Sequence, residues 1–110
     1  QLTEIAEGGY RQRTRRNVAD SDATLIVNLG ELDGGTLATK VFAEKSGKPC
    51  LVVQADLGIS EGMVVSVIAW LRQHAVKILN VAGPRESKRP GVCRLTSEML
   101  MAVDAVLQPK

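Results

Sequence analysis

The feature that most constrains the fold is a set of three short apolar segments separated by stretches with helical periodicity. The segments are Ala23–Leu29, Cys50–Gln54 and Lys77–Ala82, which read ATLIVNL, CLVVQ and KILNVA. They are rich in Val, Ile and Leu and lack a clean polar–apolar alternation, which is typical of strands buried on both faces. We therefore expect three strands in the interior of one domain.

Helices are expected between and around these strands. Their predicted ranges are Tyr10–Asp20, Thr36–Ser46, Ser60–His74 and Val92–Leu107. A connection through a helix makes successive strands run parallel, and such crossovers are right-handed. A chain of 110 residues is long enough for one such domain and too short for two. The sequence thus predicts the fold class α/β, with a parallel sheet of three strands side by side in chain order and helices on both faces.

Charge and composition narrow the class of function. Fourteen Lys and Arg against twelve Asp and Glu leave a net charge of +2, a weaker basic excess than sequence-blind nucleic-acid binders show. No apolar run approaches the ~20 residues of a membrane span, and no signal peptide is visible. Two cysteines and one histidine make neither a disulfide framework nor a zinc site. We expect a cytoplasmic protein with no metal site, no nucleic-acid partner and no membrane partner.

The first candidate for ligand binding is the loop after the first strand, Gly30-Glu31-Leu32-Asp33-Gly34-Gly35-Thr36. Ligands of open α/β sheets bind beyond the carboxyl ends of the strands. Paired glycines allow the backbone to approach a ligand closely, and the free amides of a first helical turn attract anions. The candidate binding residues are Gly30, Gly34, Gly35, Thr36 and Thr39. The same pattern also fits a plain turn in which Thr36 caps the helix.

The second candidate is the loop after the third strand, which reads Gly83-Pro84-Arg85-Glu86-Ser87. An arginine can grip a phosphate with two hydrogen bonds, and a serine can donate to the same group. We assign Gly83, Arg85 and Ser87 to the predicted site. A solvated loop with an Arg85–Glu86 pair is the alternative.

A third group lies in the first predicted helix. Arg13, Arg16 and Asn17 share one face by their three- and four-residue spacing. Arg16 and Asn17 are therefore candidates for contacts with an anion. The alternative is a solvated helix face near Asp20 and Asp22.

Three stretches resemble a known family. They are RTRRNVADSDATLIVNLGELDGGTLAT at 13–39, GKPCLVV at 47–53 and ILNVAGPRES at 78–87. Together they are similar to the putative molybdenum carrier family, a Rossmann-like group related to the lysine-decarboxylase-like nucleotide-binding proteins. The resemblance runs from about Tyr10 to Leu107. It implies a Rossmann-like sheet and a site for a phosphorylated, pterin- or nucleotide-like ligand, with the molybdenum cofactor (molybdopterin) among the candidates.

Members of that family begin with a further strand and a Gly-Gly-Gln-Thr-Gly loop, which this chain lacks. We therefore expect an N-terminally incomplete domain, with residues 1–9 as a flexible end. The missing strand would pair with the edge of Ala23–Leu29. An uncovered apolar edge invites association, so a homo-oligomer is expected.

The function predicted from these features is that of a binding or carrier protein for a phosphorylated ligand, without catalytic residues. One alternative is a nucleotide-processing, phosphoribohydrolase-like enzyme. The related enzymes carry a Pro-Gly-Gly-x-Gly-Thr-x-x-Glu loop, and the acidic residue has no counterpart at the matching place after Thr36, although Glu31 could replace it. Another alternative is a non-catalytic oligomerising domain.

Overall fold

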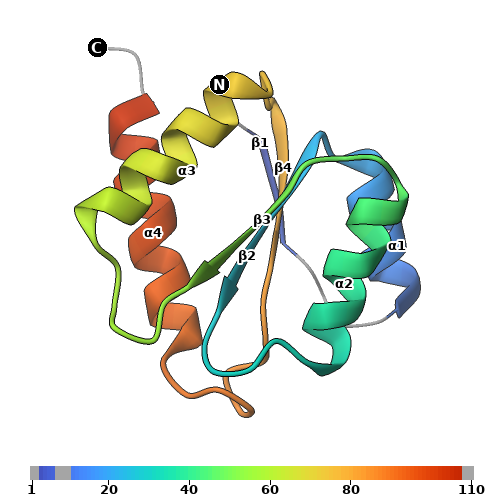
Figure 1. Ribbon diagram of the computed structural model, residues 1–110, viewed down its shortest axis with the longest axis horizontal. Helices are drawn as coiled ribbons and strands as arrows, with labels where there is room; N and C mark the ends of the chain where they lie inside the picture. The colour runs from blue at the N-terminus through green and yellow to red at the C-terminus, as the bar shows by residue number, and fades with distance from the viewer. Residues whose placement is uncertain (1–2, 7–10, 108–110) are drawn as a thin grey trace.

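The computed structural model describes residues 3–6 and 11–107, with side chains from Arg16 onward, and contains a parallel sheet between two pairs of helices (Figure 1). The strands are β1 (Thr3–Ala6), β2 (Ala23–Asn28), β3 (Cys50–Gln54) and β4 (Ile78–Ala82). The helices are α1 (Arg11–Asp20), α2 (Gly34–Lys45), α3 (Glu61–Gln73) and α4 (Val92–Leu107). The predicted α/β class is confirmed, and all three predicted strands are present. None of the helices in the described ranges combines the length and hydropathy that crossing a bilayer requires.

A short strand lies within the expected flexible end. β1 pairs in parallel with β4, so that Thr3 is opposite Ile78 and Ala6 is opposite Val81. Residues 1–2 and 7–9 of that end lie outside the described residues. The sequence does not predict β1, because a run of four residues that includes the charged Glu4 has a composition that a loop can also have.

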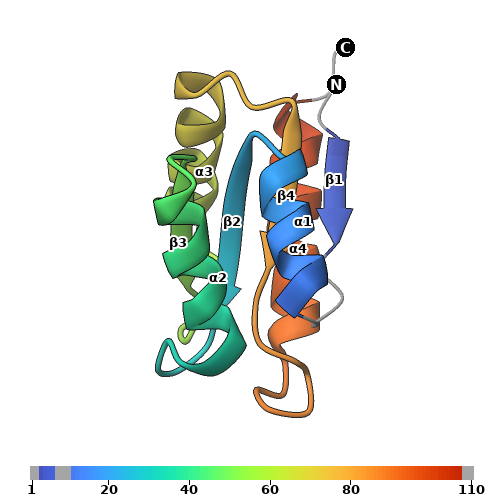
Figure 2. The same cartoon turned by 90° about the vertical axis from the view of Figure 1, so that its right-hand side faces the viewer.

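The strand order is β1-β4-β2-β3, which corrects the expected order along the chain. Figure 2 shows the strands in this spatial order from one edge of the sheet to the other. The reason is the side on which each connecting helix lies: α2 covers one face of the sheet and α3 the other (Figure 1). Right-handed crossovers on opposite faces carry the chain in opposite directions. After β3 the chain therefore returns past β2 and places β4 on its far side.

β2 is consequently the best protected strand. Its six residues are all buried, and it pairs with β3 on one side and β4 on the other. The expectation that Ala23–Leu29 has an open edge is therefore wrong, because the third predicted strand, β4, pairs with it there.

The two faces of the sheet differ in chemistry. The face toward α3 and α4 is apolar, with Leu25 and Leu79 packed in one cluster with Met99 and Val103. The opposite face includes Asn80, which is fully buried and donates from its Nδ2 to Thr24 Oγ1 at 3.3 Å. The Asn80 Oδ1 atom is also buried, and no group among the described residues donates to it, so this amide is only half satisfied.

The amino edge of the sheet is fastened by two charged side chains. The Asp22 carboxylate accepts from the backbone amides of Lys77 at 2.9 Å and Ile78 at 2.8 Å, which lowers its pKa. The Lys48 ammonium donates to the carbonyl oxygens of Val18, Ala19 and Ser21, at and just beyond the last turn of α1. A cation is favourable there because it compensates the negative end of the helix dipole.

Gly83 allows the end of β4 to lie against β2. A Cβ atom added at Gly83 would stand 2.5 Å from the carbonyl oxygen of Val27. We expect Gly83→Ala to lower the free energy of unfolding by about 1–3 kcal/mol, the usual cost of overpacking. Urea denaturation measures this change.

The matched control is Gly35→Ala, because a Cβ at Gly35 has nothing within 4 Å. This change should alter the free energy of unfolding by less than about 1 kcal/mol. Equal effects of the two substitutions would contradict the close approach of Gly83 to β2.

Candidate functional site

The carboxyl ends of β2 and β4 form the candidate site. These strands are neighbours, yet the loop after β2 leads to α2 on one face and the loop after β4 leads to α4 on the other. Open α/β sheets have their ligand crevice at such a point. The two loops lie at the same end of the molecule, at the bottom of Figure 1. Together with the first turn of α2 they contain seven of the predicted site residues, namely Gly30, Gly34, Gly35, Thr36, Gly83, Arg85 and Ser87.

Asp33 joins the two loops. Its carboxylate accepts from Lys88 Nζ at 2.7 Å and from Arg89 Nη2 at 3.4 Å. The hydrogen bond from Lys88 is the main cause that lowers the Asp33 pKa. Arg89 Nε also donates to the carbonyl oxygen of Leu29 at 2.9 Å. Because Gly30 has a positive φ of 71° and a Cβ there would stand 3.1 Å from Arg89 Nε, glycine suits this position.

The bridge by Asp33 leaves the start of α2 open. Asp33 is the N-cap residue of α2, but its side chain makes no capping hydrogen bond. The first turn closes through the amide of Leu37, which donates to the Asp33 carbonyl at 3.1 Å. No group in the described ranges accepts from the amides of Gly34, Gly35 and Thr36. The expectation that Thr36 caps the helix is therefore wrong, because α2 begins two residues earlier.

A polar network supports the first loop from the side of β3. Asn28 is buried, with 1% of the residue exposed. Its Nδ2 donates to Gln54 Oε1 at 2.7 Å and to the Gly30 carbonyl at 3.1 Å. Gln54 Nε2 donates to the same carbonyl at 2.8 Å and to Asp56 Oδ2 at 3.0 Å. Asp56 Oδ1 accepts from the Gly30 amide at 2.7 Å. Gly30 is thus bound through both of its backbone groups, which fixes the first loop against the end of β3.

The second loop carries an exposed arginine and a capped helix. Arg85 makes no ion pair or side-chain hydrogen bond with any residue the structure describes, so the alternative of an Arg85–Glu86 pair is wrong. Glu86 instead accepts from the amides of Gly91 at 2.7 Å and Cys93 at 3.0 Å. These bonds lower the Glu86 pKa. The carboxylate occupies the N-terminus of α4, whereas the N-terminus of α2 stays open.

Other predicted residues have different surroundings. Thr39 is 1% exposed, and its hydroxyl donates to the Gly35 carbonyl at 2.9 Å inside α2. Arg16 and Asn17 lie in the second half of α1, which runs toward the amino edge of the sheet. The structure therefore does not bring Arg16 and Asn17 to the two loops, and the Thr39 hydroxyl is buried and bonded within α2.

The sequence marks Arg85–Arg89 as a basic cluster but does not indicate that Lys88 and Arg89 pair with Asp33. Sequence reasoning also did not single out Asn28, Gln54 and Asp56, which support the first loop. Their position at or just after the end of a predicted strand is the one signal that marks these three. Among the described residues, no three His, Cys, Asp or Glu side chains gather in a way that could hold a metal ion.

The fold and this edge together define a Rossmann-like α/β protein with two loops joined at the carboxyl edge of its sheet. Residues 1–104 match the family described as the circularly permutated YpsA SLOG family, and the chain belongs to this family. No curated protein compared with the chain matches it.

A solved structure is similar to this chain. It is the crystal structure of a putative molybdenum carrier protein from Syntrophus aciditrophicus SB, which is 41% identical with a TM-score of 0.81. The similarity covers 86% of this chain and 60% of that chain. The chain thus spans about three fifths of that relative's length. The resemblance to the putative molybdenum carrier family is confirmed.

The cap on α4 predicts a pH effect on stability. Because the folded pKa of Glu86 lies below its ordinary value of 4.5, its contribution is present above pH 4.5 and is lost as the pH falls through the lower folded pKa. Glu86→Gln should lower the free energy of unfolding at pH 7 and flatten its decline in acid. Urea denaturation between pH 7 and pH 3 measures both.

The control is Glu98→Gln. The Glu98 carboxylate lies 3.7 Å from Arg94 Nε on an exposed helix surface. This substitution should leave the acid decline as in the unmodified chain. An unchanged decline in Glu86→Gln would show that Glu86 does not cap α4 in solution.

Proposed function

We propose that the protein binds a small phosphorylated ligand, pterin-like or nucleotide-like, and acts as a binding or carrier protein rather than an enzyme. The phosphate would lie at the N-terminus of α2, against the amides of Gly34, Gly35 and Thr36. The observation that carries this proposal is the position of Asp33. Its carboxylate turns away from its own helix and toward Lys88 and Arg89, which leaves the helix start without a cap.

The two loops carry charges of both signs. Arg85, Lys88 and Arg89 come from the second loop, together with the acidic Glu86, and Glu31 and Asp33 lie in the first loop. Glu86 accepts from amides at the start of α4, and Asp33 pairs with Lys88 and Arg89, which leaves the Arg85 guanidinium for an anion. The dipole of α2 adds roughly half a positive charge at the same place. Backbone amides at a helix start, together with nearby cations, are the usual means by which α/β proteins bind phosphate.

Gly35 supports close approach of the ligand. Since a Cβ at this position would meet nothing within 4 Å, the space above the first turn is open. Thr36 and Ser87 are further candidates for hydrogen bonds, and Gly30 shapes the first loop. We leave three predicted residues out of the proposed contacts. Thr39 is buried and bonded within α2, and Arg16 and Asn17 lie in the half of α1 near the amino edge of the sheet.

The molybdenum cofactor is one candidate ligand. The similar structure is described as that of a putative molybdenum carrier protein, and its likeness extends over most of this chain. The residues at the crevice fit the phosphate end of such a cofactor, because they offer amides and cations. They do not form a metal-ligating cluster within the described part of the chain, so the proposal places no metal on protein side chains.

A thermal-shift titration with inorganic phosphate, AMP and molybdopterin tests the proposal. At a ligand concentration of 100 times Kd the native state gains about 2.7 kcal/mol, which corresponds to a rise in Tm of about 10 °C for a domain of this size. Free adenine should not accumulate during incubation with AMP. If none of the three compounds raises Tm, the proposal fails; if adenine is released, the enzyme alternative replaces it.

Arg85→Ala should weaken the binding of the compound that gives the shift. Loss of a charged hydrogen bond costs about 1–3 kcal/mol of binding free energy. Isothermal titration measures the change in Kd. Arg94→Ala is the control, because Arg94 is exposed on α4 and lies 3.7 Å from Glu98. An unchanged Kd in Arg85→Ala would remove Arg85 from the site.

Gly35→Asp separates binding from stability. A carboxylate in the first turn of a helix favours the helix dipole, so the free energy of unfolding should stay the same or rise. The same carboxylate repels a phosphate at that turn, so binding should weaken at least tenfold. Gly35→Ala is the uncharged control. Unweakened binding by Gly35→Asp would place the phosphate elsewhere.

A further inference from the structure

β3 presents an unpaired backbone edge. It pairs with β2 alone, and the ladder uses the groups of alternate residues: Thr24 donates to the Pro49 carbonyl, and Ala55 donates to the Asn28 carbonyl. The amides and carbonyls of Cys50, Val52 and Gln54 therefore point outward. Within the described ranges, none of these outward groups has a hydrogen-bond partner.

The edge lacks the usual protection against pairing. Natural edge strands carry charges, proline or a bulge that prevents a further strand from docking. The sequence of β3 is CLVVQ, without charge or proline. Its register with β2 is continuous from Cys50 to Gln54, so it has no bulge. A strand of this kind is a template for another strand.

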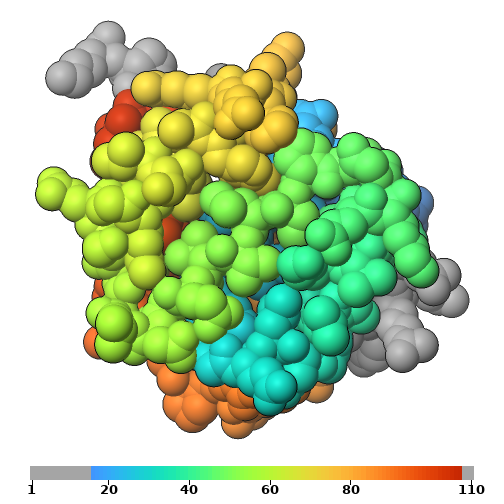
Figure 3. Space-filling view, in the orientation of Figure 1, coloured from blue at the N-terminus to red at the C-terminus, as the bar shows by residue number. Residues whose placement is uncertain are grey.

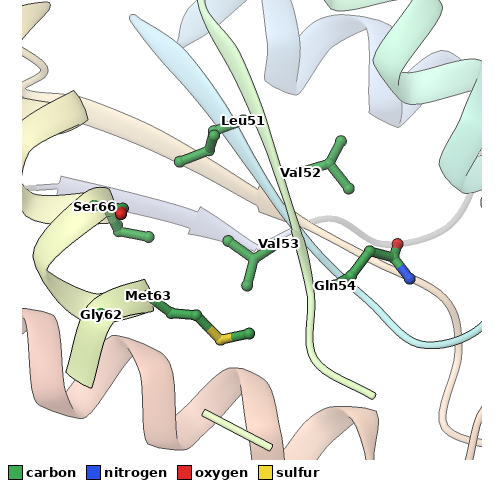
Figure 4. Close-up of a pocket in the computed structure, with 8 residues that line it drawn as sticks. Leu51, Val52, Val53, Gln54, Gly62, Met63 and Ser66 are labelled. Carbon is green, nitrogen blue, oxygen red and sulfur yellow. The ribbon is translucent and has the colours of Figure 1, made fainter. Parts of the chain in front are cut away.

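A groove runs beside this edge. It has a volume of about 480 Å³, and Leu51 and Val53 of β3 form one wall, with Gly62, Met63 and Ser66 of α3 on the other (Figure 4). Because two of the facing α3 residues are small, side chains from an added strand can enter. The space-filling view shows the hollow between α3 and β3 on this face of the molecule (Figure 3).

Exposed apolar side chains are present on the helices of both faces. Leu37 and Val41 of α2 are 41% and 40% exposed, and Val65 of α3 is 63% exposed. Lys40 and Glu44 of α2 form an ion pair at 3.1 Å. Burial is the main cause that raises the pKa of the Cys50 thiol, with a further rise from Glu44 and an opposing effect of Lys40. The helices beside β3 thus combine apolar area with one charge of each sign.

We propose that β3 is a dimerisation edge that pairs antiparallel with β3 of a second copy of this chain. A two-fold axis perpendicular to the sheet would join the two four-stranded sheets into one. It would place α2 beside α2 of the second copy on one face and α3 beside α3 on the other. The proposal is independent of the proposed ligand site, which lies at the carboxyl ends of β2 and β4.

A second copy fits this edge because the pairing is self-complementary. Each copy has the same outward groups at Cys50, Val52 and Gln54, and a two-fold contact satisfies both sets at once. Antiparallel α2 helices would also bring Lys40 of one copy toward Glu44 of the other, so that opposite charges face each other across the contact. A partner other than a second copy would have to supply both a free strand edge and charges that complement Lys40 and Glu44.

Sedimentation equilibrium and amide exchange test the proposal on the unmodified chain. We expect a monomer–dimer equilibrium. At a total concentration of about 50 times Kd, where about one tenth of the chains are monomers, exchange at the amides of Cys50, Val52 and Gln54 should slow about tenfold relative to dilute protein. The amide of Val53 faces β2 and serves as the internal reference.

Val52→Pro is the first variant, because it removes an outward amide that makes no bond within the chain. Ser66→Arg is the second, since it fills the groove without altering the strand. Both should shift the equilibrium to monomer by at least tenfold in Kd, while Met101→Lys on α4, where Met101 is 73% exposed, should not. Far-ultraviolet circular dichroism confirms that each variant is folded.

Three results would overturn the proposal. A monomer at all concentrations shows that the edge pairs with no second copy. A dimer that survives both folded variants uses another surface. A dimer broken by Met101→Lys alone uses α4.

Discussion

The structure depends on the pairing of β2 with a strand on each side. All residues of β2 are buried, and its two neighbours are β3 and β4. The chain reaches β3 through α2 on one face of the sheet and β4 through α3 on the other. Burial of the apolar side chains of β2 favours this central position. The close contact of Gly83 with Val27 shows how tightly β4 is held there. Since the two loops of the crevice extend from β2 and β4, their separation is set by this pairing rather than by the loops themselves.

The carboxyl edge combines rigid support with one open group of donors. Asn28, Gln54 and Asp56 fix Gly30 through both backbone groups. On the other side Asp33 connects the first loop to Lys88 and Arg89. Such support from neighbouring hydrogen bonds holds a binding site in its productive geometry before any ligand arrives. The start of α2 is the part of this edge that the network does not use, and this gives the proposed phosphate site its location.

Much of the architecture follows from the sequence. The three apolar segments predict β2, β3 and β4 to within a residue, and α4 has the predicted bounds, because length and periodicity determine these elements locally. The strand order does not follow, since the face chosen by α3 depends on its packing with α4. The two candidate loops were predictable because the carboxyl ends of parallel strands converge. The role of Asp33 was not, because its partner Lys88 is 55 residues away and a local pattern indicates a cap.

The distance along the chain between the two loops has a consequence for folding. Asp22 accepts from the amides of Lys77 and Ile78, 55 and 56 residues further on, and Asp33 meets Lys88 over a similar span. Such contacts form late, because a long loop must close before they stabilise the chain. β2, α2 and β3 can associate while the rest is still being synthesised. The contact between the two loops, in contrast, forms only after the segment that follows β4 has left the ribosome, so a chain that is still shorter lacks it.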